Sequence, residues 1–276
     1  DIYNPWSIIN YLDKKTFSTY WANTSSNSLV GKLIREGNRN IKMIMEDLLR
    51  GGSLHTYLDE QIVFNQLDTR ESAIWSLLLA SGYLRVEKFF PNERRGRHGY
   101  DLVLTNQEVH MMFEQMIEDW FAESVPEYND FIKALLKGDI KEMNVYMNKV
   151  ALQTISYFDT GKKPSEASEP ERFYHGFVLG LIVELSGRYT VTSNRESGYG
   201  RYDVVLEPLQ KANDAMILEF KVYDEKEEES LEDTVQSALA QIEEKQYAAA
   251  LIAKGVALER IRRYGFAFEG KKVLIG

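Results

Sequence analysis

The sequence of 276 residues contains no cysteine and only four histidines. Disulfide bonds and thiolate metal sites are therefore excluded, and the usual zinc sites are hard to assemble. Any metal ion held here would be bound through oxygen atoms. The sequence has no run of about eighteen apolar residues and no basic start followed by an apolar segment, so we expect no membrane span, no signal peptide and a cytoplasmic protein.

The net charge of −9 argues against a broad basic surface that grips phosphates without specificity. Two local basic clusters exist, at residues 94–97 and 260–263. For each cluster, ordinary surface charge is the competing interpretation to phosphate binding. The chain opens on Asp1, so we expect a piece of a longer or processed protein, and its oligomeric state is left open.

The N-terminal part predicts helices followed by a two-stranded wing and another helix. Apolar residues recur at helical spacing from Ile41 to Leu84, with a helix start at Thr69 and an end at Gly82. "YLRVEKFF" alternates like a strand, "PNERRGRHG" has the composition of a loop, "YDLVLTN" predicts a second strand, and a helix follows through Phe121. This order predicts a helical, winged-helix-like module over residues 1–125.

The middle of the chain predicts a connection. Residues 126–165 contain two amphipathic helices that part near Gly138, and then the polar, proline-containing stretch "DTGKKPSEASEP" begins. Residues 166–276 follow the order helix, three strands, helix, two strands, with a charged helix from about Ser230 to Ala250 and a hairpin closing at Gly270. We therefore predict a mixed α/β protein whose C-terminal domain is built on a mixed sheet.

Three charged residues lie in two apolar strands, "GRYDVVLEP" and "AMILEFKV". Strand alternation places Glu219 and Lys221 on one face, about 7 Å apart. If the strands form an antiparallel hairpin that pairs Leu206 with Met216, Asp203 lies opposite Glu219, with Cβ atoms about 5 Å apart. Two carboxylates at that distance repel unless they share a proton or a cation.

Mg²⁺ or Mn²⁺ held by Asp203 and Glu219 would satisfy this pair, with water and substrate completing the coordination. Lys221 beside them could hold the attacking water or neutralise charge on a phosphoryl oxygen. The residue types predict metal-assisted hydrolysis of a phosphodiester bond. The competing interpretation is an ion pair of Glu219 with Lys221 and a hydrogen-bonded Asp203 of purely structural role.

An aspartate on one strand and Glu-x-Lys on the next, within a helix-strand-strand-strand-helix-strand core, resembles the PD-(D/E)xK nuclease superfamily. "SNRESGYGRYDVVLEP", "ILEFKV" and "QIEEKQYA" are similar to the nuclease-like domain found behind an AAA-ATPase-like domain in bacterial proteins. "YNPWSIINYL" and "ASGYLRVEKFF" resemble the end of that ATPase-like region, including its winged helix. No Gly-x-x-x-x-Gly-Lys-Ser/Thr occurs, so ATP binding is not expected here and the ATPase portion would lie upstream.

The resemblance implies a restriction-endonuclease-like core and further site residues. Glu171, with Glu184 second, would complete the metal site from the first helix, although helix capping explains Glu171 equally well. Gln241 would lie near the substrate, whereas Tyr247, six residues on, falls on another part of the helix surface and predicts packing. His175, Arg195 and Arg201 are candidate substrate contacts, His175 with a structural role and the arginines with surface ion pairs as alternatives.

The function predicted is a metal-dependent nuclease acting on nucleic acid, DNA before RNA. The alternatives are an inactive nuclease-like module that binds nucleic acid or a partner, and the regulatory tail of an ATPase. "YDLVL" around Asp101 mimics "YDVVL" around Asp203, but no Glu-x-Lys strand follows it, so Asp101 predicts a structural role. Trp75 and Trp120 sit at apolar helical positions and predict core.

Overall fold

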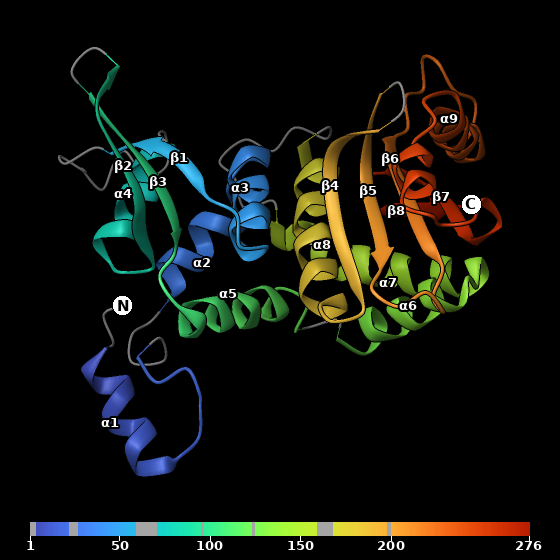
Figure 1. Cartoon of the computed structure of the whole chain (residues 1–276). Helices are drawn as coiled ribbons and strands as arrows, with labels where there is room; N and C mark the ends of the chain where they lie inside the picture. Colours follow the sequence, from blue (N-terminus) through green and yellow to red (C-terminus); the bar gives the residue numbers. More distant parts are fainter. Residues whose placement is uncertain are drawn as a thin grey trace. The chain divides into compact units, whose positions relative to one another are not determined.

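A computed structural model describes residues 4–21, 27–58, 71–94, 97–122, 125–158, 168–197 and 200–276 (Figure 1). Within these ranges the side chains of residues 92, 94, 156–158, 168–172, 194–197 and 200–202 lie outside the description. The chain forms two compact units, Asp1–Ile117 and Glu118–Gly276. The division into residues 1–125, 126–165 and 166–276 remains a prediction.

The first unit combines helices with a three-stranded antiparallel sheet. Its strands are ordered β1-β3-β2. The elements are α1 (Pro5–Lys14), α2 (Ser28–Arg35), α3 (Arg39–Leu49), β1 (Leu54–Tyr57), α4 (Glu71–Ala80), β2 (Leu84–Arg94), β3 (Arg97–Leu104) and α5 (Gln107–Asp119). Helix α4 turns its apolar side chains into the core, where Trp75 is 2% exposed. The predicted order of helix, two strands and helix is present, while the winged-helix relationship remains a prediction.

Two predictions for this unit were wrong. Strand β1 lies within the stretch that we expected to be helical. We missed it because its four residues are half-buried or exposed and do not alternate between buried and exposed positions. Of the expected loop at 91–99, residues 91–94 and 97–99 are strand, since β2 continues to Arg94 and β3 begins at Arg97, and residues 95 and 96 lie outside the described residues. The pairing of Arg94 with Arg97 extends the hairpin beyond the core. Exposed polar residues there hide the alternation of buried and exposed positions that marks a strand.

The second unit is built on a five-stranded mixed sheet of order β4-β5-β6-β7-β8. Only the pairing of β6 with β7 is parallel in this part of the structure. The elements are α6 (Val125–Lys137), α7 (Ile140–Phe158), α8 (Ser168–Leu185), β4 (Tyr189–Ser197), β5 (Gly200–Pro208), β6 (Ala215–Val222), α9 (Leu231–Glu244), α10 (Ala249–Ala253), the short η3 (Leu258–Arg260), β7 (Ile261–Glu269) and β8 (Lys272–Ile275). The predicted mixed α/β core is confirmed.

Helices cover both faces of this sheet (Figure 1). On one face Ile217 packs in an apolar cluster with Ile242 of α9 and Leu251 of α10. On the other face Phe220 stacks on Phe266 at 4.6 Å and lies 6.3 Å from the ring of Phe177 in α8. The side chains of β6 thus alternate between two faces of the sheet that are both buried, as expected for a strand in the middle of a sheet.

The outer edge of β8 is covered by side chains of α7. Asn148 donates to the carbonyl of Val273 at 2.6 Å and accepts from its N–H at 2.9 Å. Asn144, one helical turn earlier, makes the same pair with Ile275, at 2.8 Å in both directions. These amides take the place of a neighbouring strand, so the edge offers fewer free backbone groups for pairing with another chain.

The charged helix ends earlier than we expected. Helix α9 stops at Glu244, and Gln246 takes a left-handed backbone conformation with φ 53° before α10 begins. Trp75 and Trp120 are core residues, as predicted. Within the described residues, every helix is too short or too polar to cross a membrane.

Candidate active site

The hairpin of β5 and β6 has the register that we predicted. Leu206 pairs with Met216 and Val204 with Leu218, so continuing the same register places Asp203 opposite Glu219. The backbone N–H of Asp203 donates to Glu219 Oε2 at 3.4 Å. Asp203 Oδ2 accepts from the backbone N–H of Phe220 at 2.9 Å. The two carboxylates therefore lie side by side where the ladder between the strands ends.

Glu219 lies in an environment that disfavours its ionised form. Its side chain lies in the core, 3% exposed. Burial and then the charge of Asp203 raise the pKa of Glu219 to about 8. The charge of Lys221, on the same face of β6, acts in the opposite direction and lowers this pKa. A buried carboxylate beside a second carboxylate is the electrostatic situation that a bound cation relieves.

The side chain of Gln241 in α9 makes a hydrogen bond to the Glu219 carboxylate. Its Nε2 donates to Glu219 Oε1 and also to the hydroxyl of Tyr247, the latter at 3.1 Å. Our expectation that Gln241 and Tyr247 lie on different parts of one helix was wrong, because the left-handed Gln246 turns the chain back after α9 ends. Tyr247 is 2% exposed, so the predicted packing role is confirmed, with a polar contact added.

A glycine in β7 lets α9 lie close enough for this contact. Gly265 pairs with Glu219 in the parallel ladder. A Cβ atom at Gly265 would lie 2.8 Å from the carbonyl oxygen of Val235 and 3.1 Å from Cβ of Ala238, both in α9. Sequence reasoning missed Gly265, although a single glycine in an apolar strand is a sign of close backbone approach.

Helix α8 contacts β5 at the same place. The hydroxyl of Tyr174 donates to the carbonyl of Asp203 at 3.0 Å. Glu171 precedes Tyr174 by three residues in α8, about 4.5 Å along the helix axis, and its side chain lies outside the described residues. Glu184 is exposed and follows Tyr174 by ten residues, about 15 Å along the axis, which places it away from the carboxylate pair.

The remaining predicted contacts are described only in part. His175 is 3% exposed, with its ring 4.5 Å from that of Tyr174. Arg195 pairs with Tyr202 in the ladder of β4 and β5, and Glu196 pairs with Arg201. The side chains of both arginines lie outside the described residues. Their contact with substrate remains a prediction, as does that of His175.

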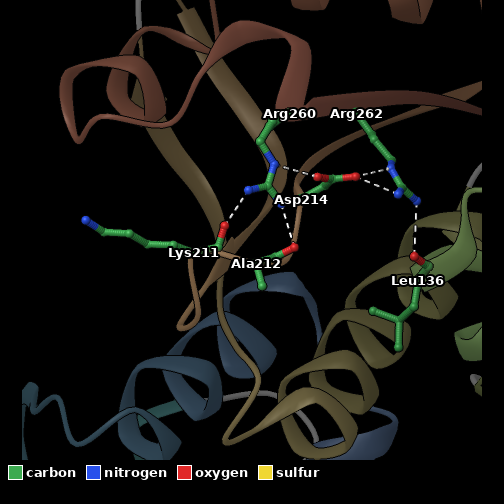
Figure 2. A network of polar contacts seen from close by, with 6 residues as sticks. All are labelled: Leu136, Lys211, Ala212, Asp214, Arg260 and Arg262. Carbon is green, nitrogen blue, oxygen red and sulfur yellow. Dashed lines mark hydrogen bonds and ion pairs between the residues drawn. The ribbon is translucent and has the colours of Figure 1, made fainter.

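The basic cluster at 260–263 is occupied by structural contacts. Figure 2 shows Asp214 between Arg260, whose Nε donates to Oδ1 at 3.0 Å, and Arg262, whose Nε and Nη2 both donate to Oδ2. Burial raises the pKa of Asp214, but the hydrogen bonds of the two arginines outweigh it and lower this pKa below its usual range. Arg263 pairs with Glu243 at 2.8 Å. Surface ion pairing is therefore the better interpretation of this cluster.

Asp101, the mimic of Asp203, also has a structural partner. Its Oδ1 lies 2.7 Å from Nδ1 of His55 on the neighbouring strand β1. Nε2 of the same imidazole lies 3.0 Å from Glu93. The two Tyr-Asp segments thus differ in their partners, since Asp101 meets a histidine and Asp203 meets a second carboxylate.

The donor set at Asp203 and Glu219 fits a small divalent cation. Mg²⁺ is commonly held by one or two carboxylates and keeps several waters. Among the described side chains, no group of three or more His, Asp or Glu residues could hold a metal ion. A third protein ligand would therefore have to come from elsewhere, and Glu171 is the candidate from the first helix.

The sheet, the helices on its two faces and the charged residues on β5 and β6 together have the form of a restriction-endonuclease-like core. Residues 169–276 match the family model of the PD-(D/E)XK nuclease superfamily, and this segment is a domain of that superfamily. No curated protein and no solved structure gives a significant match to the chain. Since the family match begins at residue 169, the likeness of the preceding part to an ATPase-like region remains a prediction.

Proposed function

We propose that the protein is a divalent-metal-dependent nuclease that hydrolyses phosphodiester bonds of nucleic acid, with DNA as the preferred substrate. The observation that carries the proposal is the pair formed by Asp203 and Glu219 with Lys221 on the same face. The superfamily of residues 169–276 supports the reaction class. The nucleic acid, the metal and the roles of individual residues are the parts that need a test.

Asp203 and Glu219 are the proposed ligands of Mg²⁺ or Mn²⁺. The bound ion would act as a Lewis acid that stabilises negative charge on a phosphoryl oxygen. Gln241 fixes the orientation of Glu219 and favours its ionised form, because an amide N–H donates to the charged carboxylate. Even with this hydrogen bond, a pKa of about 8 leaves Glu219 largely protonated at neutral pH, so a bound cation would have to displace that proton.

Lys221 is the proposed partner of the reacting phosphate. Its ammonium group can hold the attacking water or neutralise charge that develops on a phosphoryl oxygen. Glu171 is proposed as an auxiliary carboxylate from α8 and Arg195 and Arg201 as substrate contacts, whereas the burial of His175 favours the structural role for that residue. These four residues belong to the elements that adjoin the carboxylate pair, α8, β4 and β5.

The test is a cleavage assay on labelled single-stranded and duplex DNA and RNA with Mg²⁺, with Mn²⁺ and with EDTA. Asp203→Ala is expected to abolish metal-dependent cleavage, and Lys221→Ala to slow it by roughly a hundredfold or more, the scale of losing one preorganised charge-stabilising group. Asp101→Asn is the matched control, since it changes the other Tyr-Asp segment and should leave cleavage unchanged. Equal activity of wild type, Asp203→Ala and Lys221→Ala would overturn the proposal.

A nuclease-like module that binds nucleic acid without cutting it is the second candidate. The observation in its favour is the presence of only two carboxylates at the site among the described side chains. Calorimetric titration with Mn²⁺ separates the two functions. Binding that Glu219→Ala removes supports the nuclease, and binding that survives Glu219→Ala supports the second candidate.

A further inference from the structure

The strands β5 and β6 part next to the candidate active site. Within the described strands, their ladder ends where Val204 lies opposite Leu218. On its other side β5 stays paired with β4 past this point, as far as Gly200. Asp203, the residue before Val204, therefore keeps one neighbouring strand and loses the other. The backbone groups that face the opening need other partners, because an unpaired buried polar group costs free energy.

Side chains supply these partners. The N–H of Asp203 donates to Oε2 of Glu219 at 3.4 Å, and the N–H of Phe220 donates to Oδ2 of Asp203 at 2.9 Å. The carbonyl of Asp203 accepts from the hydroxyl of Tyr174 in α8 at 3.0 Å. Three backbone groups at the opening are thus bound by the two acids of the candidate site and by one tyrosine.

Tyr174 contacts both strands at the opening. Its hydroxyl binds β5 through the carbonyl of Asp203, and its ring lies 4.4 Å from the ring of Phe220 in β6. Phe220 stands between Glu219 and Lys221, so its ring points to α8 while their side chains point to the opposite face of the sheet. A single side chain of α8 therefore contacts both strands that carry the candidate site.

The surroundings of Tyr174 hold its side chain in place. Tyr174 is 7% exposed, and the ring of His175 lies 4.5 Å from its own. Beyond the Tyr174 contact, Phe220 stacks on Phe266 at 4.6 Å. A buried tyrosine needs a partner for its hydroxyl, and here that partner is the main chain of a proposed metal ligand. This burial makes Tyr174 suitable for positioning a backbone group and unsuitable for contact with a substrate.

We propose that Tyr174 is a positioning residue that fixes the Asp203 carboxylate and, resting on the proposed function, that it thereby sets how tightly the divalent cation binds. The hydroxyl holds the carbonyl of Asp203 where β6 no longer pairs with it. Without the hydroxyl, the peptide group turns toward another donor, and the carboxylate of the same residue moves with it. The hydrogen bond from Phe220 to this carboxylate then weakens. Partners that orient a metal ligand in this way tune the affinity of the site.

The test uses Tyr174→Phe, which removes the hydroxyl and keeps the ring. The first measurement is amide hydrogen exchange of the full chain, followed by NMR in the absence of metal. The amide of Phe220 should exchange about tenfold faster, the factor expected from losing part of a hydrogen bond to a charged group. The amides of residues 216–218, which lie inside the ladder, should keep their rates.

The second measurement is calorimetric titration with Mn²⁺. Tyr174→Phe should bind Mn²⁺ about tenfold more weakly than the wild type, at the lower end of the effect of an outer-shell partner. In the cleavage assay, kcat should fall at limiting Mn²⁺ and recover at saturating Mn²⁺. The KM for nucleic acid should stay unchanged, because the buried Tyr174 does not touch the substrate.

Tyr83→Phe is the matched control. Tyr83 is 6% exposed, and its hydroxyl donates to Asn27 at 2.8 Å in the first unit. Both variants lose one hydrogen bond of a buried tyrosine, so thermal unfolding should show similar losses of stability. Only Tyr174→Phe should change the exchange of Phe220 and the affinity for Mn²⁺.

An unchanged exchange rate of the Phe220 amide in Tyr174→Phe would show that Tyr174 does not position Asp203. An unchanged Mn²⁺ affinity, in a protein whose wild type binds the ion, would refute its influence on the metal site, and equal changes in Tyr83→Phe would refute both effects. A wild type that binds no Mn²⁺ would instead refute the proposed function. The exchange of Phe220 would still decide whether Tyr174 positions Asp203.

Discussion

The side-chain amide of Gln241 donates a hydrogen bond to the carboxylate of Glu219 and so joins α9 to the middle of the sheet. The same amide donates to the hydroxyl of Tyr247 at 3.1 Å. Both N–H donors of the Gln241 amide are therefore used, one by Glu219 and one by Tyr247. A buried carboxylate whose orientation is set by a second residue is the arrangement that preorganised metal ligands need.

Replacing Gln241 by alanine should weaken metal binding. The change removes the donor that favours the ionised form of Glu219, so the affinity for Mn²⁺ should fall about 10-fold to 100-fold, the usual effect of losing an outer-shell partner. Isothermal titration calorimetry measures it. Gln236→Ala is the control on the same helix, because Gln236 is exposed. Equal Mn²⁺ affinity of Gln241→Ala and Gln236→Ala would contradict this role.

Gly265→Ala should destabilise the second unit. The new methyl group would lie 2.8 Å from the carbonyl of Val235, so α9 has to move away from β7. We expect a loss of about 1–3 kcal/mol in the free energy of unfolding, as for other overpacked cores. Urea denaturation gives this value. A variant as stable as the wild type would show that α9 accommodates the methyl group and that Gly265 does not set its position.

Asn148→Ala should expose the edge of β8. The substitution leaves the N–H and the carbonyl of Val273 without the amide that now pairs with both. An unpaired buried polar group costs about 1–3 kcal/mol, and an open edge favours association between chains. Urea denaturation and light scattering test both effects. Gln153→Ala, at an exposed position of the same helix, should change neither.

The stability of the first unit should depend on His55 and fall as pH rises. The hydrogen bond to Asp101, followed by the smaller effects of Glu93, raises the pKa of His55 above 6.5. A raised pKa in the folded state means that the stabilisation is fully present below the unfolded value and disappears as pH rises through the folded value. His55 is 43% exposed, so solvent screening limits the effect to roughly 0.5 kcal/mol.

Urea denaturation of wild type and His55→Gln between acidic and mildly alkaline pH measures this dependence. The difference in the free energy of unfolding between the two proteins should be largest at the acidic end and shrink toward the alkaline end. A difference that grows with pH would mean that the neutral imidazole is the stabilising form.

Some of the site could be predicted from the sequence because strand geometry is periodic. Alternation in β6 places Glu219 and Lys221 on one face, and an unbulged hairpin is enough to bring Asp203 opposite Glu219. The contact of Gln241 with Tyr247 could not be predicted, because it depends on where α9 ends and on one left-handed residue, Gln246. Non-glycine residues seldom take a left-handed conformation, so the sequence does not predict one at Gln246.

The elements that were missed share a physical cause. Strand β1 is short, and the outer part of the hairpin is exposed on both faces, so neither carries the alternation of apolar and polar residues from which strands are predicted. The covering of β8 by Asn144 and Asn148 depends on which strand lies at the edge of the sheet. Their spacing of one helical turn was visible in the sequence, but the partner of that pair was not.

The most direct test of the proposed metal site is a crystal soaked in Mn²⁺, examined by anomalous scattering. We expect a peak between the carboxylates of Asp203 and Glu219, with oxygen ligands at about 2.1 Å, that is absent from crystals of Glu219→Ala. A fully occupied Mn²⁺ site elsewhere with none between these two carboxylates, or an unchanged peak in Glu219→Ala, would contradict it.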